Sequence, residues 1–236
     1  MRKSGSIALV ATMAVLFFSQ SPRAQSVNED GIKARLKAWY LTQTWSGGAS
    51  FSGVVFDDDI YEEVFDKDHL PMARFYSGWH PVQNLSLELS LGGLYESARS
   101  VGISTGEESK ETYEFYVLPV QARARYSFMV SEDQWAVPSI YAGGDWWYFF
   151  EKNGDEVDGD KSGYHAGADV ALLLDPLDPT AARNMKKHWN IDNTYLVLGY
   201  EYMEVGENDD GLRFSGQAYT VGLRFETYNR SALSRY

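Results

Sequence analysis

The stretch "AYTVGLRF" (218–225) alternates apolar and polar residues in steps of two, which predicts a β-strand with two unlike faces. One face carries Tyr219, Val221, Leu223 and Phe225. The opposite face carries Thr220, Gly222 and Arg224. A soluble sheet turns such an apolar face inward, whereas the wall of a membrane barrel turns it toward lipid. The alternation is compatible with both, so the rest of the chain has to decide between them.

The N-terminus has the pattern of a cleaved secretory signal. Met1, Arg2 and Lys3 precede an apolar run over 7–18 and a small, polar exit over 19–26. The run is shorter than the roughly 20 residues of a membrane helix, so we expect residues 1–26 to be removed and 27–236 to form one domain. The chain has no cysteine, which excludes a lipid anchor on cysteine and a disulfide framework.

Eight segments alternate in the same way as 218–225. The predicted strands are 31–45, 72–80, 85–93, 113–128, 135–149, 163–173, 193–203 and 218–225. An even number of strands near the roughly 9 to 11 residues of a tilted membrane strand is typical of an outer-membrane barrel. The content of 16 Tyr, 12 Phe, 7 Trp and 21 Gly agrees, because aromatic girdles and crowded lumens use these residues.

The connections are sorted by length. Those at 81–84 and 131–134 are short, whereas the predicted long loops cover 46–71, 94–112, 150–162 and 205–211. The long loops, counted from 48, hold 19 acidic and 5 basic residues, and so carry most of the negative charge of a chain with 33 acidic and 21 basic residues. Short turns on one side and long loops on the other predict an antiparallel eight-stranded up-and-down transmembrane β-barrel with both termini in the periplasm and acidic extracellular loops.

The polar rows of these strands then face a narrow lumen. An eight-stranded barrel is only wide enough for side chains or one small ligand, so we expect a charge network that fills it. The predicted members are Arg35, Lys37, Arg74, Glu88, Arg123, Arg125, Asp145, His165, Asp169, Glu201 and Arg224.

One periplasmic connection is long enough for a helix. In 175–192, Asp178 is the expected N-cap, Pro179 the first helical residue, and the basic run 186–188 the C-terminal turn. We expect this helix at the bilayer surface, with Met185 and Trp189 toward lipid. Pro119 and Pro138 fall inside predicted strands and indicate bulges or late strand starts, because each lacks a ladder N–H.

With these strands placed, the chain resembles the small outer-membrane β-barrels typified by the OmpA transmembrane domain, OmpX and OmpW. The local motif is the aromatic-ended "YTVGLRF", which is similar to the terminal strand that the barrel assembly machinery recognises, here through Tyr219, Val221, Leu223 and Phe225. The tail 226–236 departs from the pattern, because members usually stop at the terminal Phe. The stretch beginning "LLDPLDPTAARNMKK" also looks like a segment of uncharacterised barrels from Gram-negative bacteria.

Two kinds of chemistry were weighed on these residues. Some barrels of this size modify lipid A, and His165 and Asp169 share a face, but no serine follows His165 two positions on, so we expect no enzyme. The carboxylates Asp155, Glu156, Asp158 and Asp160 form a candidate Ca²⁺ or Mg²⁺ site, without the spacing of an EF-hand. No other cofactor is expected.

The sequence therefore predicts an outer-membrane barrel of a Gram-negative bacterium, with a filled lumen and a structural or surface-binding role. Its expected partners are outer-membrane lipids, lipopolysaccharide and the assembly machinery, while the negative charge disfavours nucleic acid. One alternative is a narrow pore or carrier for small hydrophobic solutes, as in OmpW-type members. Another is a soluble periplasmic lipocalin-like barrel, with the apolar rows around a ligand and the charged rows outside.

Overall fold

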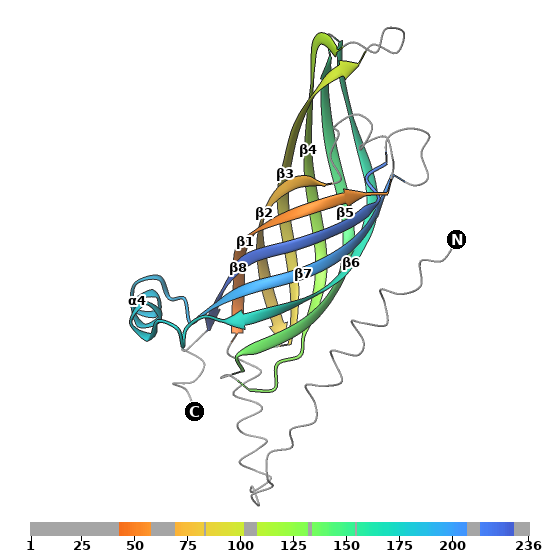
Figure 1. Ribbon diagram of the computed structural model, residues 1–236. Coiled ribbons are helices and arrows are strands. Elements are labelled where there is room, and N and C mark those ends of the chain that lie inside the picture. The colour runs from red at the N-terminus through yellow and green to blue at the C-terminus, as the bar shows by residue number, and fades with distance from the viewer. Residues whose placement is uncertain are drawn as a thin grey trace, which may run out of the picture. The chain divides into compact units, whose positions relative to one another are not determined.

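The structure is a computed structural model. It describes residues 43–57, 69–82, 84–101, 108–131, 134–153, 155–206 and 213–228. Over these residues, eight antiparallel strands close into a barrel in sequence order, with one helix between the sixth and seventh strands (Figure 1). The elements are β1 (Gln43–Phe56), β2 (Leu70–Val82), β3 (Leu85–Val101), β4 (Glu108–Ser127), β5 (Ala136–Asn153), β6 (Asp155–Leu173), α4 (Pro179–Trp189), β7 (Asn193–Val205) and β8 (Gly216–Tyr228). The predicted fold class is confirmed, while the predicted signal segment 1–26 lies outside the described residues.

The barrel closes where β8 pairs with β1, from Phe56 opposite Gly216 to Gln43 opposite Tyr228. The alternation of residues 218–225 is visible in β8. Tyr219 and Leu223 are 59% and 42% exposed on the outer face, whereas Arg224 is 3% exposed and points inward. The apolar rows therefore face outward, which is opposite to the lipocalin-like arrangement and excludes it.

The first strand lies later than predicted. β1 covers Gln43–Phe56, most of which is predicted to be a loop, and only 43–45 of the predicted strand 31–45 lie among the described residues. Its Gly- and Ser-rich sequence resembles a loop, but the lumen requires small residues at this point. A Cβ on Gly48 would lie 2.1 Å from the carbonyl oxygen of Leu223 and 2.6 Å from the hydroxyl of Tyr76. Arg35 and Lys37 lie outside the described residues.

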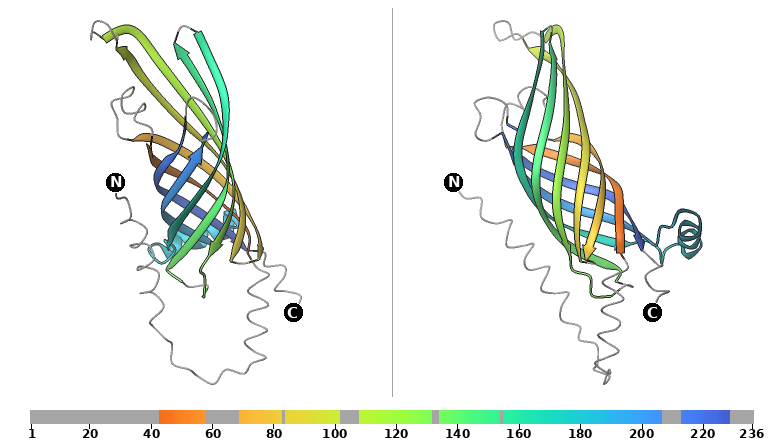
Figure 2. Two further views of the ribbon diagram at one scale, coloured as in Figure 1. Left: turned by 90° about the vertical axis from the view of Figure 1, so that its right-hand side faces the viewer. Right: turned by 180° about the vertical axis from the view of Figure 1, so that it is seen from behind.

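Two predicted loops are largely strand. β3 and β4 pair as far as Val101 opposite Glu108, and β5 and β6 pair as far as Asn153 opposite Asp155, with only residue 154 between them. The predicted loops 94–112 and 150–162 are therefore wrong over most of their length. The four strands β3 to β6 have 17, 20, 18 and 19 residues, against 14 or 13 in the others. Figure 2 shows these two hairpins rising beyond the rest of the barrel. We call the part of β3 to β6 beyond Tyr95, Tyr116, Phe150 and Tyr164 the raised hairpins.

Pro119 lies within β4 without the predicted bulge. It pairs with Trp147 in an unbroken β4–β5 register. On its other side stands Gly92, where a Cβ would lie 2.7 Å from the ring of Pro119. The absence of a side chain at Gly92 thus makes room for the proline ring. Pro138 is the third residue of β5 and pairs with Val170, again in a continuous register.

The helix α4 begins and ends as the sequence predicts. Asp178 is the N-cap, and its side chain accepts hydrogen bonds from two N–H groups of the first turn, at 3.0 and 2.9 Å. Pro179 is the first helical residue, and Asn190 ends the helix in the left-handed conformation, with φ 56°. No residue of α4 is buried, so the helix stands outside the barrel packing.

Candidate functional site

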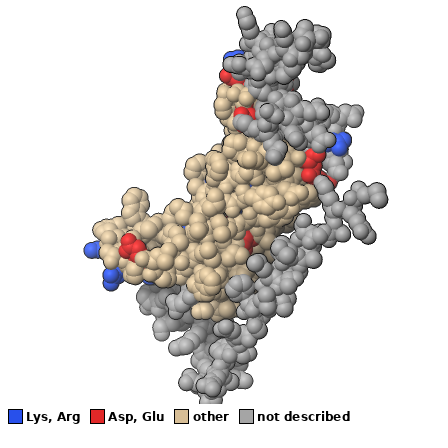
Figure 3. Space-filling view, viewed as in Figure 1, with Lys and Arg blue, Asp and Glu red and all other residues tan. Residues whose placement is uncertain are grey.

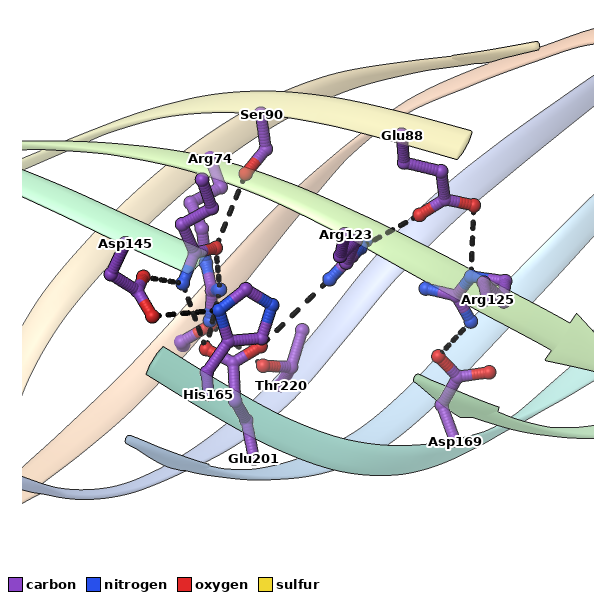
Figure 4. A network of polar contacts seen from close by, with 12 residues as sticks. Arg74, Glu88, Ser90, Arg123, Arg125, Asp145, His165, Asp169, Glu201 and Thr220 are labelled. Atoms are coloured by element: carbon purple, nitrogen blue, oxygen red, sulfur yellow. Dashed lines mark hydrogen bonds and ion pairs between the residues drawn. The ribbon is translucent and has the colours of Figure 1, made fainter. Parts of the chain in front are cut away.

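Glu88 of β3 is the centre of one half of the polar lumen (Figure 4). Its two carboxylate oxygens accept hydrogen bonds from Nε of Arg123, at 2.7 Å, and Nε of Arg125, at 2.8 Å. A nitrogen of Arg224 lies 3.8 Å away on the β8 side. Arg125 also pairs with Asp169 of β6. One buried carboxylate thus holds three guanidinium groups from two different strands.

The same arginines lie against tyrosine rings. The guanidinium carbon of Arg123 is 4.6 Å from the ring centre of Tyr141 and 5.5 Å from that of Tyr76, and that of Arg125 is 4.8 Å from Tyr141. Cations stacked on aromatic faces in a water-poor site gain more than in solution. The tyrosines therefore contribute to holding the charges as well as filling space.

The other half of the polar lumen is built around Gln121. Its amide oxygen accepts a hydrogen bond from Arg74, at 2.7 Å, and its amide nitrogen donates to Asp145, at 2.7 Å, and Glu201, at 3.3 Å. Arg74 also pairs with Glu201, at 2.7 Å, and Nδ1 of His165 lies 2.7 Å from Asp145. This network connects five strands, β2 and β4 to β7, across the lumen.

The structure brings nearly all the predicted lumen residues together. The described members are Arg74, Glu88, Arg123, Arg125, Asp145, His165, Asp169, Glu201 and Arg224, with side chains 0–8% exposed. The predicted set contains only charged residues and histidine, and therefore lacks Gln121, Tyr76 and Tyr141. Each of these stands on the polar row of its strand, so strand parity could have found them.

A second part of the lumen, on the side of the raised hairpins, is apolar. Phe214, in the connection before β8, is fully buried at its centre. Its ring centre lies 5.2 Å from that of Trp147, 5.7 Å from Phe149, 6.1 Å from Phe56 and 6.2 Å from Phe115. Around these rings pack Val54, Leu70, Met72, Leu94, Val117, Met203, Val205 and Ala218. We call this set the apolar chamber, and the sequence analysis did not predict it.

Little space remains inside the barrel. A cavity of about 30 Å³ lies among residues of the polar network, including Arg74, Arg123, Tyr141 and Glu201. This volume suits one or two water molecules. The apolar chamber closes one side, and the buried side chains of Val137 and Tyr195 lie toward the end near α4. The described lumen is therefore filled by its own side chains.

The outer wall is apolar. Leu87, Leu89 and Leu91 of β3 are 48%, 61% and 57% exposed, a pattern that water would penalise and lipid would not. Exposed aromatic residues stand at both ends of these rows. Near α4 they are Trp45, Trp79, Tyr126 and Trp135, and below the raised hairpins they are Tyr95, Tyr116, Tyr148, Tyr164, Tyr202 and Tyr219. Figure 3 shows one face of this wall almost without charge, with charged residues gathered near its two ends.

Carboxylates mark the point where the wall becomes polar. Tyr116 donates to Glu114 at 3.4 Å, the indole of Trp146 donates to Asp160 at 2.9 Å, and Tyr164 donates to Glu204. The apolar rows therefore end at exposed aromatic residues, and the polar tips of Tyr116, Trp146 and Tyr164 bond to acidic neighbours, as at a membrane–water interface.

The candidate cation site has a different geometry from that expected. Asp155, Glu156, Asp158 and Asp160 belong to β6 and pair with β5, so they form no loop. The side chains of Asp155 and Glu156 lie outside the described ones, and Asp158 and Asp160 are exposed. Among the described residues, no group of three or more potential ligands is arranged around a metal position.

The terminal-strand residues lie on the outer side of β8. Tyr219, Val221 and Leu223 are exposed, and Phe225 is half-buried. Within the described part of the chain, no helix is long and apolar enough to span a membrane.

Comparison with known proteins gives likeness in structure alone. No family model and no curated protein matches the sequence. The outer membrane protein OprG from Pseudomonas aeruginosa has a TM-score of 0.55 and 10% identity over 81% of this chain and 99% of that chain. The N-terminal β-barrel domain of OprF from Pseudomonas aeruginosa has a TM-score of 0.46 and 12% identity, over 78% and 98%. Ail, the attachment invasion locus protein of Yersinia pestis, has a TM-score of 0.44 and 13% identity over 78% of this chain and 97% of that chain. The likeness to OprG is one of fold, and it agrees with the predicted barrel.

Proposed function

We propose that this chain is an outer-membrane barrel of a Gram-negative bacterium that does not conduct, and that its role is structural or binding at the cell surface. The observation that carries this proposal is the filled lumen. The charge network leaves a cavity of about 30 Å³, which is too small for a continuous water path. The function is then carried by the parts of the molecule that project from the membrane.

Insertion in a membrane is supported by the wall. Rows of exposed leucine between two aromatic ends are stable in lipid and costly in water. OprG, which has the same fold, is an outer membrane protein. The signal-like segment 1–26 agrees with export from the cytoplasm.

The two ends of the barrel differ in the length of their connections and hairpins, and this difference supports one orientation of the barrel in the membrane. The end with α4 has the short connections after β2 and β4, and we assign it to the periplasm together with both termini. The raised hairpins then face the exterior and are the candidate binding surface. We place lipopolysaccharide and divalent cations among its partners because carboxylates such as Asp158 and Asp160 are exposed on the raised hairpins. We place the assembly machinery among them because of the terminal-strand pattern of β8.

The buried geometry does not favour catalysis. His165 pairs with Asp145, and Asp169 pairs with Arg125, so the combination of His165 and Asp169 weighed from the sequence is not assembled. Both groups are closed off from lipid and water by the wall. We therefore propose no enzymatic role.

The proposal is tested on membranes from expressing cells. After a carbonate wash, the protein should stay with the membrane and change its mobility on an SDS gel when boiled. The purified barrel should add no steady conductance to a planar bilayer. Release by carbonate without a heat shift would overturn membrane insertion, and stepwise conductance would overturn the closed lumen.

The apolar chamber favours a second candidate, a carrier of small hydrophobic solutes. Such a solute could replace the ring of Phe214 among Trp147, Phe149 and Phe115. The charge network would stop it from passing through the lumen, so a carrier role requires an exit through the wall. Binding of a hydrophobic probe to the intact barrel would favour this candidate over the first.

A further inference from the structure

The connection between β6 and β7 exposes two large apolar side chains at the edge of the barrel. Leu177, just before α4, is 81% exposed, and Trp189, at its end, is 76% exposed. Neither belongs to the outer face of a strand. Figures 1 and 2 show α4 projecting sideways from the barrel end instead of covering it. For a barrel in a bilayer, this position lies over the surface of the leaflet.

The helix has two unlike sides. Ala182, Met185 and Trp189 recur at three- and four-residue spacing and form the apolar side. Arg183 and Lys187, four residues apart, stand on the opposite side and are both exposed. The helix contains no acidic residue, although the whole chain has a net charge of −12. Figure 3 shows basic residues, in blue, at this edge of the molecule, next to acidic residues in red.

The structure holds this helix in place without burying it. Met185 contacts Thr194 of β7, with 3.8 Å between the sulfur and the hydroxyl oxygen, which corrects the expectation that Met185 faces lipid. Lys186 pairs with Asp192, at 3.2 Å. Asp175 accepts a hydrogen bond from the N–H of Thr194, at 3.1 Å. These contacts fix α4 to the start of β7, so that Leu177 and Trp189 stay exposed.

We infer that α4 is a docking element for the leaflet nearest to it, with Leu177 and Trp189 in the headgroup region and Arg183 and Lys187 on the phosphates of anionic phospholipids. Exposed apolar residues next to cations, at the end of the barrel where Trp45, Trp79 and Trp135 are exposed, fit the chemistry of an interfacial helix. The inference rests on the proposed membrane insertion of the barrel.

The test uses the absence of cysteine from the chain, which permits single labels. The full-length variants Leu177→Cys and Val221→Cys carry an environment-sensitive fluorophore. Each is refolded into vesicles of phosphatidylcholine alone, or of phosphatidylcholine and phosphatidylglycerol in equal amounts, with a headgroup nitroxide lipid as the quencher. Val221 lies on the outer wall of β8, so its label reports insertion of the barrel itself.

We expect quenching at both positions, and stronger quenching at 177 with phosphatidylglycerol. Each cation contributes about fivefold to binding at an anionic surface, so loss of two cations alone lowers the docked-to-undocked ratio by about 25-fold. The pair Arg183→Glu and Lys187→Glu also adds two negative charges, and should lower the ratio further. Lys152→Glu, on the raised hairpins, is the matched charge control and should change nothing. Quenching at 221 without quenching at 177 would overturn docking and leave the proposed function standing. Loss of quenching at both positions would overturn insertion of the barrel. Quenching at 177 that is the same with and without phosphatidylglycerol, and the same in the paired charge-reversal variant, would overturn the assignment to anionic lipid.

Discussion

Arg74 of β2 reaches across the barrel to Glu201 of β7, with 2.7 Å between Nη1 and Oε1, although these two strands are not neighbours. Both side chains are almost fully buried, at 4% and 1% exposed. The backbone ladder holds each strand only to its neighbours. The bridge between Arg74 and Glu201 is therefore one of the contacts that fix the cross-section of the barrel and keep its lumen closed.

Loss of one partner of this bridge should cost more than loss of both. Arg74→Leu leaves Glu201 charged and buried without its main cation, and we expect the free energy of unfolding to fall by about 3–5 kcal/mol. The double variant Arg74→Leu, Glu201→Leu removes the charge as well, and should recover much of that loss. Urea unfolding in phospholipid vesicles, followed by the heat-dependent gel shift, measures both. Additive losses in the double variant would show that the two charges do not stabilise each other.

Phe214 should be the side chain that closes the apolar chamber. Phe214→Ala removes a fully buried ring and should lower the free energy of unfolding by about 3–5 kcal/mol. The emptied space should bind a hydrophobic fluorescent probe, which the wild-type barrel binds less. Phe75→Ala is the control, since Phe75 is 69% exposed on the outer wall. Equal probe binding by the two variants would mean that Phe214 does not occupy a separable chamber.

Much of the barrel could be predicted because the alternation is strong where lipid faces the wall. The strands at 72–80, 85–93 and 193–203 lie within β2, β3 and β7 for this reason. Glu88 and Glu201 are correctly predicted to face the lumen for the same reason. Beyond the exposed aromatic residues below the raised hairpins, the outer face is polar. The ends of β3 to β6 there have no alternation of apolar and polar residues, so the sequence predicts loops.

The remaining errors come from packing that no single strand reveals. β1 was missed because its Gly and Ser residues fit a crowded lumen, and this crowding depends on Tyr76 and Leu223 of other strands. The apolar chamber was missed because Trp147 and Phe149 stand on the inward row of β5, where only polar residues were expected. Phe214 belongs to no strand, and its position depends on the closed barrel around it.

Gly143 should be irreplaceable for reasons of space. A Cβ at this position would lie 2.1 Å from the carbonyl oxygen of Ala122 and 2.7 Å from Cα of Arg123, both of them backbone atoms. Gly143→Ala should therefore separate β4 from β5 locally and cost at least about 1–3 kcal/mol. Gly144→Ala is the neighbouring control, because its nearest contact would be 3.9 Å away. Each variant is refolded, and the yield of barrel that shifts on a gel when boiled is measured. Similar yields for the two variants would refute the steric argument.

Asp175, in the turn between β6 and α4, should make stability depend on pH. Partial burial raises the pKa of its carboxyl group, and the charge of Asp192 adds to this, while the hydrogen bond from the N–H of Thr194 opposes it. Because the pKa is higher in the folded than in the unfolded protein, the ionised group lowers stability at neutral pH. The contribution of Asp175 to the free energy of unfolding rises as the pH falls through the pKa that this group has in the folded protein. It levels off below the pKa in the unfolded protein, which is about 3.9.

Asp175→Asn keeps an oxygen that accepts from the N–H of Thr194 and removes the charge. We expect a higher Tm than wild type at pH 7, and a difference that shrinks as the pH falls toward the unfolded pKa of about 3.9. Asp178→Asn, which preserves an equivalent helix cap, controls for the loss of one negative charge at this end of the barrel. Thermal unfolding of the three proteins across this range measures the effect. A Tm for Asp175→Asn at or below that of wild type at pH 7 would mean that the carboxylate of Asp175 is stabilised by its surroundings.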